Sequence, residues 1–211
     1  MITRRDTLVL MGAAALAAKA GIGPALAQNV NQGELLKPDP LGDVWLGPDS
    51  AKVAIVEYAS LTCGHCAHFH NTTYKELKKR YIDAGQVRFT LRPFPLNQID
   101  TALYMVARSE ASKYYGITDL LFETQESWLR EPSKVLATVK QLLRQAGISE
   151  DRFNETLKDQ KLLDGINAVR QRATDTFKVD STPTIFVNGI RQQGDASIDG
   201  LEKLIKPALG A

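Results

Sequence analysis

The two cysteines of this 211-residue chain stand three positions apart, in the run Cys63-Gly64-His65-Cys66. The eight residues before them, 53–60, are mostly apolar and partly β-branched, which is the pattern of a buried strand. After them, apolar residues recur at helical spacing while lysine and arginine fall mainly on the opposite side. The sequence therefore predicts a strand that ends just before Cys63 and a helix that begins there.

This position gives the first cysteine a chemical use. Unpaired backbone N–H groups and the positive end of the dipole at a helix N-terminus stabilise a thiolate. Cysteines in catalytic Cys-x-x-Cys motifs accordingly have pKa values of roughly 3.5 to 7.5, against about 8.5 for a free cysteine. A purely structural disulfide between residues so close together would restrict the unfolded chain little, because loop-closure entropy grows with loop length. The spacing therefore favours a reactive pair.

The first 27 residues have the three parts of an export signal. These are a pair of arginines at 4–5, an apolar region at 7–18 that is too short to span a bilayer, and Ala-Leu-Ala at 25–27 before a predicted cleavage site. The arginines resemble those of a twin-arginine signal, but Thr7 stands where that pattern usually has an aromatic residue, so general secretory export stays an alternative. Export would bring the chain into an oxidising compartment, in which disulfides persist.

Charge gives no support to a nucleic acid or an anionic membrane surface as a partner. Residues 1–27 carry three of the 26 basic and one of the 24 acidic residues, so the remainder has no net charge. Its length suits a single domain with a sizeable core.

A polar arm and one α/β domain are predicted downstream of the signal. Residues 28–43 are polar and contain two prolines, which favours an extended arm. The domain, 44–211, then opens with a short edge strand. The strands predicted at 53–60 and 87–91 are joined by a helix, and a strand-helix-strand unit favours a parallel pair.

The second half combines a long helical stretch with a late hairpin. Apolar residues recur at helical spacing throughout 97–178, which predicts an all-helical insert. Asn-Gly at 188–189 is a strong two-residue hairpin signal between strands at 184–187 and 190–193. Ser197 can cap a final helix.

Three features together resemble the thioredoxin superfamily, and within it the DsbA-like thiol:disulfide oxidoreductases of bacterial envelopes. They are the cysteine pair after a strand, Glu57 six residues before Cys63, and Ser-Thr-Pro-Thr at 181–184 at the start of a late strand. The resemblance covers about 44–211. It implies a thioredoxin-like α/β fold in which βαβ and ββα halves share a central sheet, and the helical insert between the halves is typical of DsbA-like members.

The resemblance also implies how the cysteines work. We assign Cys63 as the attacking cysteine and Cys66, one helical turn further in, as the resolving one, with a redox-active disulfide between them. A partly positive His65 would help to stabilise the Cys63 thiolate. Glu57 would shuttle protons for Cys66, and the alternative for Glu57 is an acid at the exposed edge of its strand.

Pro183 resembles the cis-proline that packs beside the active-site sulfurs in this superfamily. Thr182 would then offer its backbone to an extended substrate, and its hydroxyl would tune the cysteines. The alternative is a trans-proline that merely opens a strand.

These features predict a periplasmic, monomeric thiol:disulfide oxidoreductase that needs no cofactor and forms disulfides in newly exported thiol-containing proteins. DsbA-type oxidants usually have Pro-His between the cysteines, whereas Gly64-His65 is the dipeptide familiar from protein disulfide isomerases, so a reductase or isomerase stays an alternative. The family implies a membrane redox partner, which is a quinone-linked oxidase for an oxidant and a thiol donor for a reductase. Residues 28–52 are too few for the dimerisation domain of dimeric bacterial isomerases.

A metal-binding module is the alternative from another functional class. His68 and His70 join Cys63 and Cys66 to complete the ligand types of a Cys₂His₂ zinc or copper site. All four ligands would have to converge around the first turn of the helix, so we predict no metal.

Overall fold

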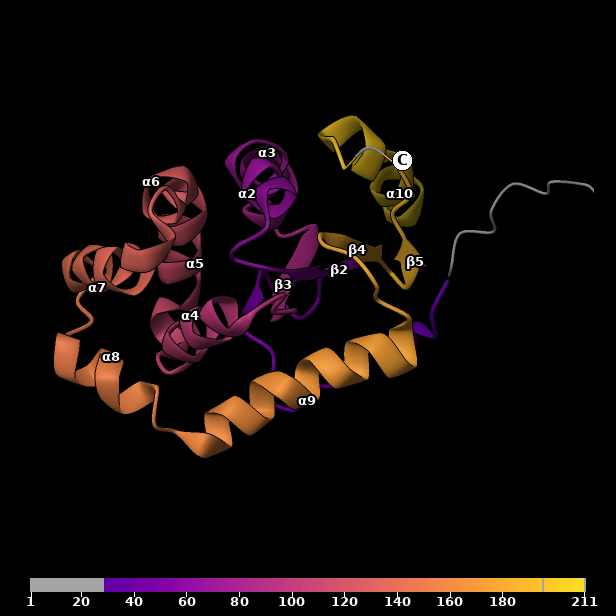
Figure 1. The fold of residues 1–211 in the computed structure, drawn as a ribbon. Coiled ribbons are helices and arrows are strands. Elements are labelled where there is room, and N and C mark those ends of the chain that lie inside the picture. The colour runs from indigo at the N-terminus through magenta and orange to yellow at the C-terminus, as the bar shows by residue number, and fades with distance from the viewer. Residues whose placement is uncertain (1–28, 195, 211) are drawn as a thin grey trace, which may run out of the picture.

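The computed structural model describes residues 29–194 and 196–210, and the predicted export signal, 1–27, lies outside them. Within this part of the chain, the strands form one mixed sheet in the order β1-β3-β2-β4-β5. Figure 1 shows α2, α3 and α10 on one side of the sheet and α9 on the other. The strands are β1 (Trp45–Leu46), β2 (Val53–Ala59), β3 (Val87–Pro93), β4 (Thr184–Val187) and β5 (Ile190–Arg191).

The predicted thioredoxin-like arrangement is confirmed by the pairing of the strands. β2 and β3 are parallel, with Val53 opposite Val87 and Ala59 opposite Pro93, whereas β4 runs antiparallel to β2. All seven residues of β2 are buried because the strand is central and covered on both faces. The hairpin of β4 and β5 turns at 188–189, where both residues have positive φ, as a two-residue hairpin turn of this kind requires.

The helix predicted between β2 and β3 is interrupted. α2 (Gly64–Asn71) ends at Thr72, and the chain continues as α3 (Thr73–Leu77) and the π-helical turn η1 (Lys78–Ile82). The Thr72 hydroxyl donates to the carbonyl of His68 at 2.7 Å, a side-chain bond of the kind that bends helices.

The stretch between β3 and β4 is helical, as the fold prediction requires. α5 packs against α2, and α4 packs against α9. Asn97, Ser149 and Asp159 each accept a backbone N–H at the start of a helix. The elements are α4 (Gln98–Arg108), η2 (Ala111–Lys113), α5 (Tyr114–Glu123), α6 (Gln125–Leu129), η3 (Pro132–Lys134), α7 (Val135–Gln145), α8 (Glu150–Thr156) and α9 (Gln160–Phe177). The chain ends in α10 (Ile198–Leu209), which Ser197 caps.

Hydrophobic residues form a cluster on each face of the sheet. Side chains alternate along β2, so that Val53 and Ile55 join the larger cluster with α2 and the insert, while Val56 and Tyr58 join the smaller one with α9. By the same alternation Glu57 faces the α2 side.

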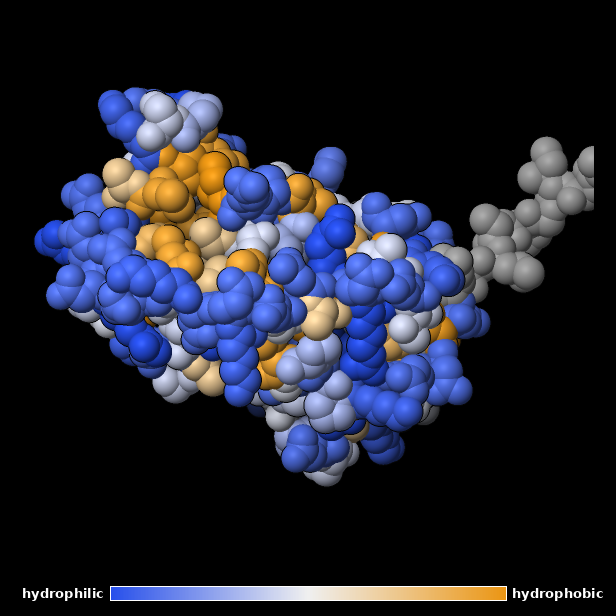
Figure 2. All heavy atoms as spheres, turned by 60° about the horizontal axis from the view of Figure 1, so that its bottom comes forward, coloured by the Kyte–Doolittle hydropathy of each residue, from blue (hydrophilic) through white to orange (hydrophobic). Residues whose placement is uncertain are grey.

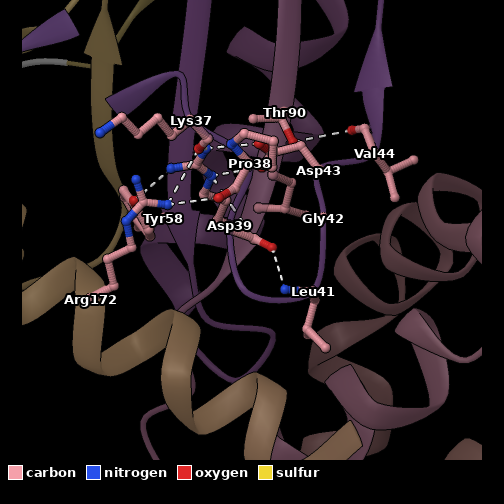
Figure 3. Close-up of polar contacts among 12 residues, drawn as sticks. Lys37, Pro38, Asp39, Leu41, Gly42, Asp43, Val44, Tyr58, Thr90 and Arg172 are labelled. Atoms are coloured by element: carbon pink, nitrogen blue, oxygen red, sulfur yellow. Dashed lines mark hydrogen bonds and ion pairs between the residues drawn. The ribbon is translucent and has the colours of Figure 1, made fainter. Parts of the chain in front are cut away.

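For residues 29–43, which the structure describes, the prediction of an extended arm is wrong. The segment contains the one-turn helix α1 (Gln32–Leu35), whose Leu35 is 1% exposed. The guanidinium of Arg92, from β3, makes hydrogen bonds to both carboxylate oxygens of Asp43 at 2.7 and 2.8 Å. Figure 3 shows Tyr58 and Arg172 beside this segment. Composition did not reveal the packing because the partners of the segment lie far along the chain.

None of the helices in the described ranges is long and apolar enough to cross a membrane. On the face drawn in Figure 2, hydrophobic residues gather toward the end of the molecule where the insert helices lie, and the remainder is mostly hydrophilic.

Candidate active site

Cys63 is the N-cap residue of α2, and Cys66 lies one turn inside the helix. Cys63 is half-buried and Cys66 is fully buried, and both are free thiols. Within the described chain, no side chain caps this helix, so its first N–H groups face the sulfur of Cys63. The Cys63 thiol donates to the carbonyl oxygen of Thr182 at a sulfur-to-oxygen distance of 3.4 Å.

The environment moves the pKa values of the two thiols in opposite directions. A hydrogen bond from the Cys66 thiol, another from the Thr182 side chain, and local backbone N–H groups lower the pKa of Cys63 to about 5, although burial acts against them. Burial raises the pKa of Cys66, and the hydrogen bond to Cys63 and the negative charge of Glu57 raise it further. At neutral pH Cys63 is therefore a thiolate while Cys66 keeps its proton.

A groove runs beside the cysteines. The peptide bond between Thr182 and Pro183 is cis. Both residues line a cavity of about 540 Å³ together with His65, Phe69 and residues at the start of α10. His65 is exposed at the first turn of α2. Thr182, Pro183 and His65 therefore share one surface, and Cys63 lies beside it through its contact with Thr182.

Glu57 lies behind this surface and is fully buried, so the alternative of an acid at an exposed strand edge is wrong. One of its carboxylate oxygens, Oε2, is 2.9 Å from Nε2 of His70. The His70 ring stacks on Phe122 at a centroid distance of 4.1 Å and contacts the ring of Tyr74 at 4.6 Å. The two titratable side chains form a buried pair beneath α2.

Two residues of the insert hold the loop before Cys63, and sequence reasoning missed both. The Leu61 N–H donates to Asp100 Oδ1 at 2.9 Å, and Gln125 Nε2 donates to the carbonyl oxygens of Leu61 and Cys63 at 2.8 and 3.0 Å. Asp100 also accepts the N–H of Leu96, and burial raises its pKa to about 6. The only signal in the sequence was an acid, Asp100, and an amide, Gln125, among apolar residues of the predicted insert.

The arrangement of the histidines differs from that of a metal centre. Among residues 29–194 and 196–210, no three His, Cys, Asp or Glu side chains converge on a position that could hold an ion. His70 is directed at Glu57, while His68 is exposed and lines the groove.

Comparisons with known proteins agree with this geometry. A family model described as thioredoxin matches residues 40–207. A Rickettsia felis protein named as a protein-disulfide oxidoreductase is 29% identical over 171 residues, which are 79% of this chain and 60% of that protein. Disulfide bond formation protein D of Bacillus anthracis is 28% identical over 173 residues, which are 78% of this chain and 77% of that protein.

Solved structures give the same result. Wolbachia pipientis alpha-DsbA1 matches with a TM-score of 0.77 and 26% identity over 85% of this chain and 96% of its own. The chain spans about 60% of the length of the Rickettsia felis and Rickettsia prowazekii relatives. Since the family model covers most of the sequence, and the cysteine pair, the cis-proline and the sheet stand in the matching region, the chain belongs to the thioredoxin family.

Proposed function

We propose that this chain is a thiol:disulfide oxidoreductase that exchanges disulfides with protein thiols through Cys63 and Cys66. The observation that carries the proposal is the contrast between the two sulfurs, because one is held as a thiolate at the mouth of a groove and the other is a buried thiol next to it. Exchange needs an accessible thiolate to attack and a second thiol to resolve the mixed disulfide.

Oxidation of a client proceeds in two exchanges. A client thiolate attacks Cys63 Sγ of the Cys63–Cys66 disulfide, the bond between the two enzyme sulfurs breaks, and Cys66 leaves with the electron pair and takes up a proton. A second client thiolate then attacks the client sulfur of the mixed disulfide and releases Cys63 as a thiolate. The client loses two electrons and the enzyme gains them. The low pKa of Cys63 makes it a good leaving group in the second step.

The groove supports an extended protein segment as the client. Backbone groups of Thr182 stand beside the reactive sulfur, and the cavity along α2 and α10 is large enough for side chains next to the client cysteine. Glu57 would accept and return the proton of Cys66, since its charge acts on that thiol.

The direction we favour is oxidation of cysteines in exported proteins in the periplasm. A stabilised thiolate stabilises the reduced enzyme, which is the property of a strong oxidant. The Bacillus anthracis relative is named for disulfide bond formation, and alpha-DsbA1 carries the name of an oxidant family. A quinone-linked membrane partner would reoxidise the enzyme. A reductase or isomerase with a membrane thiol donor is the second candidate, because Gly64-His65 departs from the usual Pro-His.

The test is stoichiometric oxidation of a reduced peptide that contains two cysteines. We expect the oxidised protein to convert it to the disulfide and Cys63→Ser to be inactive. Reduced Cys66→Ser, mixed instead with the disulfide form of the peptide, should be trapped as a mixed disulfide at Cys63, because the Cys63 thiolate attacks the peptide disulfide and no resolving thiol follows. Exchange by Cys63→Ser at the parental rate would overturn the proposal.

A glutathione titration tests the direction of the reaction. We expect a reduction potential of the cysteine pair nearer to about −120 mV, the value for DsbA, than to about −270 mV, the value for thioredoxin. A potential near the latter would favour the reductase.

A further inference from the structure

Three buried polar atoms that lie close together lack a hydrogen-bond partner within the described residues. They are Oε1 of Glu57, Nδ1 of His70 and the hydroxyl of Tyr74. The nearest charged group to Nδ1 is the carboxylate of Asp119, whose Oδ1 lies 3.9 Å away. A cavity of about 90 Å³, large enough to hold water, is lined by His70, Tyr74 and Asp119, each of which carries polar atoms.

His70 lies between the buried acid that acts on the resolving cysteine and a carboxylate at the surface. Glu57 acts on Cys66 through its charge and contacts Nε2 of His70 through Oε2. The opposite ring nitrogen, Nδ1, faces Asp119, whose side chain is 39% exposed. The imidazole therefore joins a buried carboxylate to one that reaches solvent.

Asp119 reaches solvent on the opposite side of α2 from the client groove. The groove lies between α2, α3 and α10, whereas the cavity at His70 lies between α2, α3 and α5. Figure 1 shows α2 and α3 between α5 and α10. A client that covers the groove leaves the α5 side open.

We propose that His70 relays the proton of Cys66 between Glu57 and Asp119, so that the resolving thiol exchanges its proton with solvent behind a bound client. This inference rests on the proposed function, because it assigns a positioning residue to the resolving step. The observation that carries the relay is the contact between His70 Nε2 and the buried carboxylate of Glu57.

The relay operates when the Cys63–Cys66 disulfide forms from a mixed disulfide at Cys63. Cys66 gives its proton to the Glu57 carboxylate and attacks Cys63 Sγ of a mixed disulfide. The Cys63–Cys66 bond forms, and the other thiol leaves with the electron pair. Glu57 then passes its proton to Nε2 of His70, while Nδ1 releases a proton to Asp119 or to water in the cavity. Reduction of the disulfide moves a proton back through the same groups, so the two tautomers of His70 alternate without rotation of the ring, which stacks on Phe122.

The charged groups around His70 are consistent with proton transfer from Glu57 through His70 to Asp119. Burial raises the pKa of Asp119 above its ordinary value, which makes it a better proton acceptor. Burial also raises the pKa of Tyr74, so its hydroxyl stays protonated and can orient water. The other charged groups at this cavity are Lys75, Lys78 and Glu123, and Lys75 is paired with Glu123 at 2.7 Å.

The test separates attack by Cys63 from resolution by Cys66. The reduced protein is mixed with an aromatic disulfide, and a first release of coloured thiol reports attack by Cys63. A second release reports attack by Cys66 on the mixed disulfide. Both are followed by stopped flow from acidic to alkaline pH in the parent, His70→Gln and Asp119→Asn, with Glu155→Gln on α8 as a matched loss of one surface carboxylate.

In His70→Gln we expect the second release to slow by at least about tenfold near neutral pH, and in Asp119→Asn by a few-fold. Both should recover as the concentration of a small buffer increases, because the buffer replaces the relay, and a purely structural defect would not respond in this way. The first release and the Glu155→Gln control should stay at parental rates.

A second release at the parental rate across the pH range in Asp119→Asn, a half-exposed position that does not threaten folding, would overturn the relay. So would a slow second release in His70→Gln that is indifferent to buffer. Absence of the first release in the parent would instead count against the proposed function.

Discussion

Among single residues, Thr182 has the most direct influence on the reactive sulfur apart from the cysteine pair. Its carbonyl accepts from the Cys63 thiol, and its side chain helps to lower the pKa of Cys63. The same residue precedes the cis-proline that lines the groove, so client position and sulfur ionisation depend on one backbone segment.

Thr182→Val keeps the shape of this side chain and removes its hydroxyl. We expect the pKa of Cys63 to rise above about 5, because a hydrogen bond to the thiolate is lost. The reduced form is then stabilised less, and the equilibrium constant with glutathione should shift toward the oxidised enzyme by roughly tenfold. Thiolate absorbance against pH and a redox titration measure the two effects. Thr174→Val, on the exposed side of α9, should change neither.

The same pKa makes the stability of the reduced protein depend on pH. The pKa of Cys63 is about 5 in the folded chain and about 8.5 in an unfolded one, so the thiolate stabilises the folded state fully above about pH 8.5. This contribution falls as the pH drops and is lost below about pH 5. Denaturant unfolding of reduced and oxidised protein should show a difference that shrinks over this window, and in Thr182→Val the loss should be complete at a higher pH.

Spacing alone predicted only the reactive cysteine pair. The roles of Glu57 and Pro183 were expected from the resemblance to the thioredoxin superfamily. The contact between Glu57 and His70 was missed, because a histidine on a helix can face solvent, a core or a ligand, and only packing of α2 over β2 decides which.

At the scale of elements, the helical insert supports the site as well as covering it. Asp100 from α4 accepts the N–H of Leu61, and Gln125 from α6 donates to the carbonyls of Leu61 and Cys63. Helical periodicity revealed the insert, but it gives no information on which polar side chains turn inward.

Gln125→Leu should leave the carbonyl oxygen of Leu61 without a partner in a region where Gln125 is 5% exposed, while the carbonyl of Cys63 keeps the N–H of Ala67. An orphaned buried polar group costs roughly 1 to 3 kcal/mol, so we expect the free energy of unfolding to fall by about 2 kcal/mol. Amide hydrogen exchange of the loop before Cys63 should accelerate. Urea unfolding and exchange measure the two effects, and Gln141→Leu on the exposed face of α7 is the matched control. Equal stability of the two variants would contradict a supporting role for the insert.

Across the whole molecule, residues 29–43 form part of the domain. Val30 donates to the carbonyl of Gly189 at 2.8 Å, and Arg172 on α9 donates to carbonyls of the segment. Its most buried contact is the ion pair of Arg92 and Asp43, whose side chains are 1% and 3% exposed. Polarity and prolines predicted an arm because they describe the segment alone and not its partners.

Asp43→Asn should leave the charge of Arg92 buried with a weakened partner, although Asp39 lies 4.0 Å away and compensates in part. Breaking a buried pair costs about 3 to 5 kcal/mol, so we expect a loss of about 3 kcal/mol in the free energy of unfolding. Asp49→Asn removes the carboxylate of a surface pair with Arg88 and should cost less than about 1 kcal/mol. Comparable losses in urea unfolding would show that the segment contributes no more than a surface contact.

The hydrogen bonds that Asp100 on α4 and Gln125 on α6 make with the backbone of Leu61 limit how the site can be moved to another protein. The strand, loop and helix that carry the cysteines are not a self-contained cassette, since both backbone groups of Leu61 find their partners outside it. Grafted into a small thioredoxin scaffold without these helices, the cassette would bring two unsatisfied polar groups beside its reactive sulfur. A functional graft must therefore include partners equivalent to Asp100 and Gln125.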